Sequence, residues 1–174
     1  NIKHRSIFVI EASSYQLDYS KLFNSKYAAI LNISPDHLER HKTLKNYISA
    51  KFKIIKNQKK NSVAFINKHD ANINKKIRQS YYKSKIVKVN TRLSDKLSTS
   101  NKENLAFVLE ISKKLKIKKN ILIDVINNFK GLKYRQEIIF DNKNISIIND
   151  SKSTSYSSSL EMLKKSNNVY WLLG

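Results

Sequence analysis

Cysteine is absent from the 174-residue chain, and no apolar run in it is long. Without cysteine the protein has neither a disulfide framework nor thiolate chemistry, which is compatible with a reducing compartment. The longest apolar runs, residues 7–10 and 27–31, are far shorter than the roughly 20 residues of a membrane-spanning helix. No basic and apolar leader is recognisable at the start of the sequence. We therefore expect a soluble, cytoplasmic protein that does not enter a membrane.

Acidic residues and arginine are also scarce, although the chain is strongly basic. It contains 34 Lys or Arg residues against 13 Asp or Glu, for a formal charge of +21, but only five of the cations are arginines. Proteins that bind nucleic acids favour the bidentate guanidinium and interleave cations with aromatic side chains. Here the lysines are spread along the chain, and Tyr81-Tyr82 is the one notable aromatic pair. We expect no nucleic-acid partner, and a basic nucleic-acid-binding module remains as an alternative.

Apolar residues make up 40% of the chain, which is enough for a buried core. Short apolar runs predict strands at residues 7–10, 27–33, 62–67 and 85–90. Apolar residues at helical spacing predict helices around residues 44–55, 105–115 and 121–129. Strands that alternate with helices indicate an α/β domain with a mainly parallel sheet.

Gly131, one of only two glycines, follows the last of these helices, where a left-handed cap is expected. We place a domain boundary there, with a first domain at residues 1–130 and a second at residues 131–174. The second domain is predicted to contain a β-hairpin, a helix and a final strand, at residues 137–148, 156–163 and 169–173. A strand followed by a single glycine predicts the first part of an α/β domain that is cut short.

Polar residues directly follow two of the predicted strands. Glu11 follows the first strand, and Asp36-His37 follows the second after Pro35. Open α/β sheets bind ligands at the carboxyl ends of their strands, and an Asp–His pair there can hold a cation or a phosphate. Taken alone, the residues after Glu11 are better explained by a turn and a helix N-cap. His37 and His41 have the spacing of a zinc-binding helix face, but no thiol or third spaced histidine accompanies them, so we discount zinc.

Lys51 has an unusual place in the predicted helix. At about 100° per residue it falls near the middle of the apolar stripe rather than on the solvated face. That stripe is formed by Leu44, Tyr47, Ile48 and Ile55. Burying an ammonium is costly unless it is paired or loses its charge. Either the stem passes the stripe and the ammonium reaches water, or Lys51 is carbamylated and has become a carboxylate that can bind metal. Periodicity leaves both alternatives open.

Four stretches of the chain, in this order, resemble the Mur ligase family. They are Glu-Ala-Ser-Ser-Tyr-Gln-Leu (11–17), Asn-Ile-Ser-Pro-Asp-His-Leu-Glu-Arg-His (32–41), Ala50-Lys51, and Ile-Asn-Asp-Ser-Lys-Ser-Thr (148–154). Gly-Leu-Lys-Tyr-Arg-Gln-Glu (131–137) resembles the family's link into its C-terminal domain. The resemblance covers nearly the whole chain. It implies an α/β central ATP-binding domain with a mainly parallel sheet, followed by the first part of a Rossmann-like C-terminal domain.

The resemblance also implies roles for particular residues. The family's magnesium-binding positions fall on Glu11, His37 and a carbamylated Lys51, with Asp36 beside them. Contacts to the UDP-sugar substrate fall on Ser13 and Gln16, and further substrate-side contacts on Lys152 and Thr154. The asparagines that face ATP correspond to Asn101 and Asn104, while Arg135 and Asp150 approach the nucleotide from the next domain. The residues expected to be catalytic are Lys51, His37 and Lys152.

The implied activity is ATP-dependent amide bond formation in peptidoglycan biosynthesis. D-glutamate would be added to UDP-N-acetylmuramoyl-L-alanine through an acyl phosphate, with ATP and Mg²⁺ as cofactors, and the protein is expected to be a monomer. The family's glycine-rich phosphate loop is missing, since the chain has only two glycines, and so are the N-terminal domain and the rest of the C-terminal one. We expect this piece alone to be inactive. Another Mur ligase, folylpolyglutamate synthetase and a non-catalytic remnant stay open as alternatives.

Overall fold

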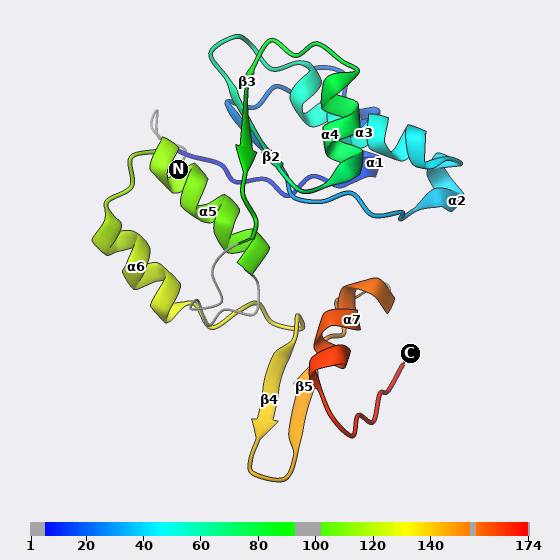
Figure 1. Cartoon of the computed structure of the whole chain (residues 1–174), viewed down its shortest axis with the longest axis vertical. Coiled ribbons are helices and arrows are strands. Elements are labelled where there is room, and N and C mark those ends of the chain that lie inside the picture. The colour runs from blue at the N-terminus through cyan, green and yellow to red at the C-terminus, as the bar shows by residue number, and fades with distance from the viewer. Residues whose placement is uncertain (1–5, 93–101, 154–155, 174) are drawn as a thin grey trace. The chain divides into compact units, whose positions relative to one another are not determined.

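A computed structural model describes residues 6–92, 102–153 and 156–173 of the chain (Figure 1). The chain forms two compact units, Asn1–Ile117 and Lys118–Gly174. Each unit has its own secondary structure.

The first unit is built on a three-stranded parallel sheet. Its strands are β1 (Tyr27–Ile30), β2 (Val63–Asn67) and β3 (Lys85–Val89), in the order β1-β2-β3. Tyr27 pairs with Val63, and Val63 pairs with Lys85. Three of the strands expected from apolar runs are thus confirmed, and so is the α/β class with a parallel sheet.

Both faces of this sheet are covered by helices, so that β2 is buried along its whole length. Ala64 and Ile66 pack on one face against α3 (Leu44–Lys56) and α4 (Ala71–Arg78). Val63 and Phe65 pack on the other face against α5 (Lys102–Lys114). Successive side chains of a strand point to opposite faces, which explains this division. Full burial of a side chain such as Phe65 or Ile66 contributes about 1.5–3 kcal/mol.

Two further helices lie beside α3, and the apolar pattern did not predict them. They are α1 (Ser14–Tyr19) and α2 (Leu38–His41). Both are short, and both begin just after the polar residues that follow the first two apolar runs. The helix α4 was also not expected; Asp70 begins it by accepting a hydrogen bond from the Ile73 N–H at 2.8 Å. Asp is a strong N-cap because its carboxylate satisfies a backbone donor that has no partner within the helix.

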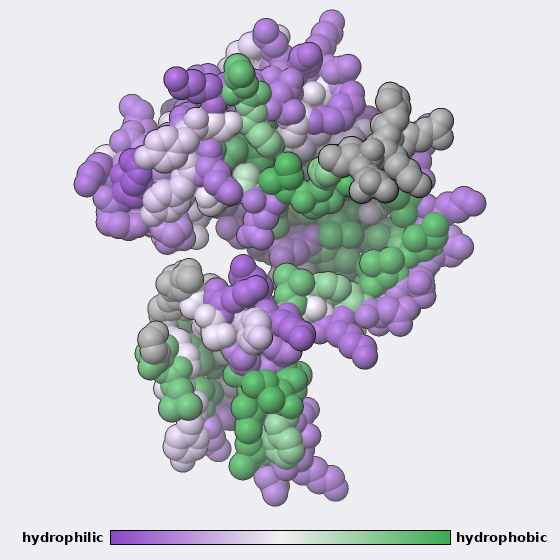
Figure 2. Space-filling view, turned by 180° about the vertical axis from the view of Figure 1, so that it is seen from behind, coloured by the Kyte–Doolittle hydropathy of each residue, from purple (hydrophilic) through white to green (hydrophobic). Residues whose placement is uncertain are grey.

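The second unit contains α6 (Lys119–Asn128), β4 (Glu137–Asp141), β5 (Ser146–Asn149) and α7 (Tyr156–Lys165). The two strands pair antiparallel, which confirms the expected hairpin. Apolar side chains are exposed over both of them, as Figure 2 shows. Gly131 adopts a left-handed conformation with φ +86°, but the helix ends earlier, with Phe129 as its C-cap. Gly131 therefore turns the chain beyond the helix rather than capping it.

Two predicted strands are wrong. Residues 7–10 and 169–173 form neither strand nor helix, and their side chains are exposed; Val9 and Tyr170 are each 96% exposed. A strand needs a neighbour to take its backbone hydrogen bonds, and within the described ranges neither segment pairs with another strand. Among the described helices, none combines the length and the apolar character needed to cross a bilayer.

Candidate functional site

The start of α1 carries the first group of predicted site residues. Ser13 is its N-cap: Ser13 Oγ accepts a hydrogen bond from the Gln16 N–H at 3.2 Å, and the Ser13 N–H donates to Gln16 Oε1 at 2.8 Å. This capping box satisfies two backbone donors reciprocally. The box uses the oxygens of Ser13 and Gln16 as acceptors, so the Ser13 hydroxyl and the Gln16 amide nitrogen keep their hydrogens for a ligand.

The loop after β1 carries the second group, Asp36 and His37. The His37 N–H donates to Asp36 Oδ1 at 3.0 Å, and His37 Nε2 lies 3.4 Å from Asp36 Oδ2. The His37 backbone is left-handed, with φ 52°, and the edge of its ring meets Tyr15 at a centroid distance of 5.0 Å. A carboxylate and an imidazole are thereby held together just before α2.

Glu39 extends this polar group on α2. It accepts a hydrogen bond from the Tyr15 hydroxyl at 3.1 Å, and its Oε1 lies 3.7 Å from His37 Nδ1. The pKa of Glu39 is lowered, mainly by a hydrogen bond from its own backbone and further by Tyr15 and His37. The pKa of Tyr15 is raised, first by desolvation and then by Glu39. Tyr15 therefore stays a neutral donor and Glu39 an anionic acceptor near neutral pH.

Lys51 supplies the third group, from α3. Its side chain is half-buried, and its ammonium nitrogen lies 5.0 Å from the centre of the Tyr47 ring. Tyr47 itself is buried, at 3% exposure. The position on the helix agrees with the prediction that Lys51 lies along the apolar stripe. Within the part of the chain that the structure describes, no carboxylate forms an ion pair with Lys51.

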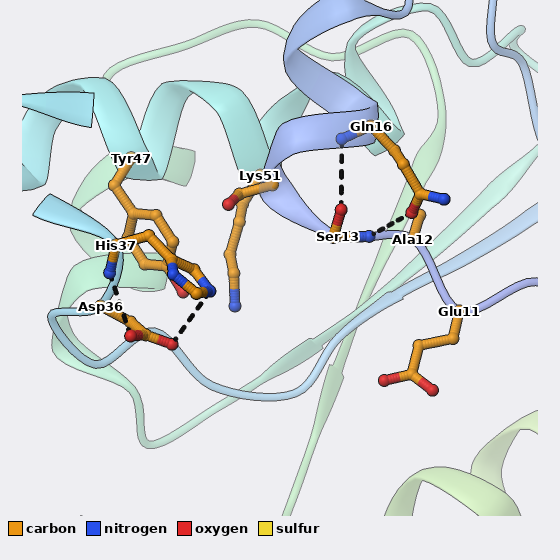
Figure 3. Close-up of a pocket in the computed structure, with 9 residues that line it drawn as sticks. Glu11, Ala12, Ser13, Gln16, Asp36, His37, Tyr47 and Lys51 are labelled. Atoms are coloured by element: carbon orange, nitrogen blue, oxygen red, sulfur yellow. Dashed lines mark hydrogen bonds and ion pairs between the residues drawn. The ribbon is translucent and has the colours of Figure 1, made fainter. Parts of the chain in front are cut away.

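These three groups line one pocket of about 600 Å³ (Figure 3). The Lys51 side chain extends into it between His37 and Glu11, and Ser13 and Gln16 border it on the α1 side. Six residues singled out in the sequence meet there, from three separate segments: Glu11, Ser13, Gln16, Asp36, His37 and Lys51. The first unit thus brings together two carboxylates, an imidazole, an ammonium and uncharged donors.

A divalent cation in the pocket would meet carboxylates, an imidazole and an ammonium. Among the described residues, no three His, Cys, Asp or Glu side chains are arranged to hold a metal ion. Glu11 and His37 offer a carboxylate and an imidazole, while an unmodified Lys51 ammonium between them would repel a cation. A carbamylated Lys51 would add an oxygen ligand of the kind that Mg²⁺ prefers. With that modification, Glu11, His37 and Lys51 would together supply three ligands for a divalent cation.

The two histidines at the spacing of a zinc-binding helix face have different surroundings, since His37 lines the pocket and His41 does not. His41 is buried, at 5% exposure, and its Nε2 lies 3.0 Å from Ser14 Oγ. Its ring packs against Tyr47 at a centroid distance of 5.5 Å. His41 therefore joins α1, α2 and α3, and does not line the pocket beside His37.

The remaining predicted site residues fall elsewhere. Asn101 and Thr154 lie outside the described residues, and Asn104 is exposed on α5 of the first unit. In the second unit, Asp150 accepts hydrogen bonds from the Gln136 N–H at 3.1 Å and from the Ser159 hydroxyl at 2.7 Å. Lys152 Nζ lies 5.8 Å from the centre of the Tyr134 ring, and Arg135 is exposed. The nucleotide-binding roles of Asn101, Asn104, Arg135 and Asp150, and the substrate-binding and catalytic roles of Lys152 and Thr154, stay predictions.

Four contacts that hold the elements around the pocket had no signal in the apolar pattern. Asp70 and Asn72 bind the backbone of Ile33, and His41 binds Ser14. Asp18 forms an ion pair with Lys53 at 2.9 Å, and this hydrogen-bonded cation lowers the Asp18 pKa. Only Asp70 could have been found in the sequence, since an Asp before a helical segment is a typical N-cap.

The chain belongs to the Mur ligase family: the model of the Mur ligase middle domain matches residues 2–129. Among its relatives are enzymes named UDP-N-acetylmuramoylalanine--D-glutamate ligase. The one from Rickettsia prowazekii (strain Madrid E) is 33% identical over 195 residues, covering 96% of this chain and 44% of the relative. That from Alkaliphilus oremlandii (strain OhILAs) is 30% identical, with 96% and 43% covered. That from Wolbachia sp. subsp. Brugia malayi (strain TRS) is 32% identical, with 84% and 34% covered. The chain thus spans less than half the length of these relatives.

Proposed function

We propose that this chain is part of an ATP-dependent ligase that joins D-glutamate to UDP-N-acetylmuramoyl-L-alanine in peptidoglycan biosynthesis. The observation that carries the proposal is the convergence of Glu11, His37 and Lys51 on one pocket. These residues match the family's magnesium-binding positions and come from three segments far apart in the sequence. The names of the relatives support the same substrates.

The proposed reaction has two steps. The carboxylate of UDP-N-acetylmuramoyl-L-alanine attacks the γ-phosphorus of ATP, so that ADP leaves and an acyl phosphate forms. The amino group of D-glutamate then attacks the acyl carbon, loses a proton, and phosphate leaves. Bound Mg²⁺ would supply neutralisation of the negative charge that gathers between the two anions.

The residues of the pocket would divide this work. Glu11, His37 and carbamylated Lys51 would hold Mg²⁺, with Asp36 fixing the backbone and ring of His37. The Ser13 hydroxyl and the Gln16 amide would donate to the UDP-sugar. Asn101 and Asn104 would face ATP in this proposal.

We further propose that residues 131–174 begin a C-terminal domain, with the first domain at residues 1–130. Arg135 and Asp150 would contact the nucleotide from it, and Lys152 and Thr154 the substrate. The Gln136 N–H and the Ser159 hydroxyl both donate to Asp150 and orient its carboxylate. The whole enzyme is proposed to be a cytoplasmic monomer, and this piece alone to be inactive.

Lys51→Ala in the complete protein tests the central residue. We expect loss of D-glutamate-dependent phosphate release to below about 1% of the parent activity, because removing a charged group that acts in the transition state costs several kcal/mol. Added acetate or formate should restore part of it by replacing the carbamate oxygens. Lys56→Ala is the matched control, since Lys56 is exposed on the same helix. Full activity of Lys51→Ala would exclude the carbamate, and a parent protein that accepts another amino acid in place of D-glutamate would exclude the proposed substrate.

A further inference from the structure

The loop that carries Asp36 and His37 to the pocket has little regular structure of its own. It begins where β1 ends at Ile30 and runs to the start of α2 at Leu38. In the part of the chain that the structure describes, both hydrogen bonds that join residues 32–36 to another element fall on one residue, Ile33. The path of the loop toward the pocket therefore depends on how Ile33 is held.

Ile33 is held at both backbone groups by side chains from the N-terminal end of α4. Its N–H donates to Asp70 Oδ2 at 2.8 Å, and its carbonyl accepts from Asn72 Nδ2 at 3.1 Å. Its own side chain is buried in the core, at 4% exposure. We call this pair of contacts the Ile33 clasp. It fixes backbone and side chain together, so Ile33 is an anchor between the sheet and the loop.

One carboxylate serves both the helix and the loop. Asp70 Oδ1 accepts the Ile73 N–H as the N-cap of α4, while Asp70 Oδ2 accepts the Ile33 N–H. Asn72 takes no part in capping, and its amide reaches the Ile33 carbonyl instead. The effects of the two residues can therefore be distinguished by experiment, since Asp70 also caps α4 and Asn72 does not.

The conformation of His37 explains why the loop needs an anchor. Its φ of 52° is left-handed, a conformation that costs a residue with a Cβ atom energy and persists only where the surroundings determine it. On one side it is followed by α2, and on the other Ile33 is held four residues before it.

We propose that Asp70 and Asn72 are positioning residues, whose clasp on the Ile33 backbone sets the approach of Asp36 and His37 to the pocket. Neither residue lines the pocket, so they act through the loop. The catalytic part of this inference rests on the proposed function. The structural part of the inference, that the clasp orders residues 33–37, is independent of the proposed function.

Asn72→Asp in the complete protein is the sharpest test. The substitution keeps the size of the side chain but removes the donor to the Ile33 carbonyl. An acid in the first turn favours a helix, so α4 is not weakened. Asp70→Ser is the second variant, because serine keeps a strong N-cap but is too short to serve Ile33 as well. Asn57→Asp is the control: Asn57 donates to the Lys21 carbonyl at 3.0 Å and lies outside the pocket.

Amide hydrogen exchange and steady-state kinetics are then measured on the same proteins. In both clasp variants, exchange at Ile33 and His37 should quicken about tenfold, with β2 unchanged, since the loop opens locally. The kcat should fall about fivefold to tenfold with the KM values for ATP and D-glutamate kept, as for a group placed correctly only in the transition state. Asn57→Asp should change neither.

Unchanged exchange at residues 33–37 in both clasp variants would overturn the proposal. So would faster exchange across the whole first unit, which would mean that the clasp only stabilises the fold. Faster exchange confined to the loop with an unchanged kcat would reject the catalytic part. If the parent protein shows no D-glutamate ligation, the proposed function fails, and exchange still decides whether the clasp orders the loop.

Discussion

Ser13 combines a structural and a proposed binding role in one side chain. Its oxygen begins α1, and its hydroxyl hydrogen is the group that would meet a substrate. The Ser-x-x-Gln spacing of Ser13 and Gln16 is itself a recognised N-terminal signature. Residues of the binding surface are thus held rigid by the same bonds that start the helix.

Ser13→Ala should lower the free energy of unfolding by about 1 kcal/mol, because it leaves the Gln16 N–H without its capping oxygen. Thermal denaturation of the parent and the variant measures this change. Ser13→Thr keeps the oxygen and should recover most of the stability. Equal melting temperatures for Ser13→Ala and the parent would show that α1 does not depend on its cap.

At the same scale, the sequence predicted which side chains meet in the pocket better than it predicted what holds them. Glu11, His37 and Lys51 stood out because a polar residue directly after an apolar run, or within an apolar stripe, breaks a pattern. The contact of Asp70 with the Ile33 backbone joins two residues that are 37 apart in the sequence, and it leaves no irregularity in the apolar pattern. Side-chain bonds to a distant backbone have no period in the sequence and become visible only in the fold.

Among the elements, α1 is fastened to α2 and α3 by charged and polar pairs. Lys53 on α3 donates to Asp18 Oδ1 at 2.9 Å and also to the Asp18 carbonyl. Arg40 on α2 donates to the Tyr19 hydroxyl at 2.8 Å and lies 3.7 Å from Asp18. Asp18 lies on α1 and thus links this helix to α2 through Arg40 and to α3, the helix that carries Lys51, through Lys53.

Asp18→Asn should destabilise the protein in a pH-dependent way. The Asp18 pKa lies below its usual range because of the hydrogen bond from Lys53, so the pair contributes stability above pH of about 4 and loses it as the pH falls through the lowered pKa. For a partly exposed pair the effect should be about 0.5–1 kcal/mol at neutral pH. Melting temperatures of parent and variant at pH 7 and pH 3 measure it. A gap between them that widens toward pH 3 would contradict this assignment.

The elements also mark where sequence patterns succeed. β1, β2 and β3 were predicted because each is apolar, and they form strands because each has a neighbour in the sheet. Residues 7–10 and 169–173 are as apolar, but they pair with no strand in the described part of the chain. Composition indicates that a segment can form a strand, whereas its partner decides whether it does. The helices α1 and α2 were missed because a few residues are too short for a helical period to show.

At the scale of the whole molecule, we expect the charge of +21 to cause only weak binding to polyanions, unlike the tight binding of a nucleic-acid-binding protein. Dispersed lysines should hold the protein weakly on heparin and on single-stranded RNA, without sequence preference, and modest salt should release it. Retention on heparin and Kd values for two unrelated RNA sequences, at low and physiological salt, provide the measurement. Tight, sequence-selective binding at physiological salt would contradict the proposed ligase and favour a nucleic-acid-binding module.

The central position of β2 shapes how the chain reaches its fold. Its neighbours come from both directions in the sequence, since Val63 pairs with Tyr27 on one side and with Lys85 on the other. The connections from β1 to β2 and from β2 to β3 must both fold before the five residues of β2 are paired on both sides. Such non-local pairing is slow. Until then an apolar segment is open to pairing with other chains. Lys59 and Lys60 before β2 and Lys68 after it place positive charge at both of its ends, and we expect this charge to oppose aggregation while the protein folds.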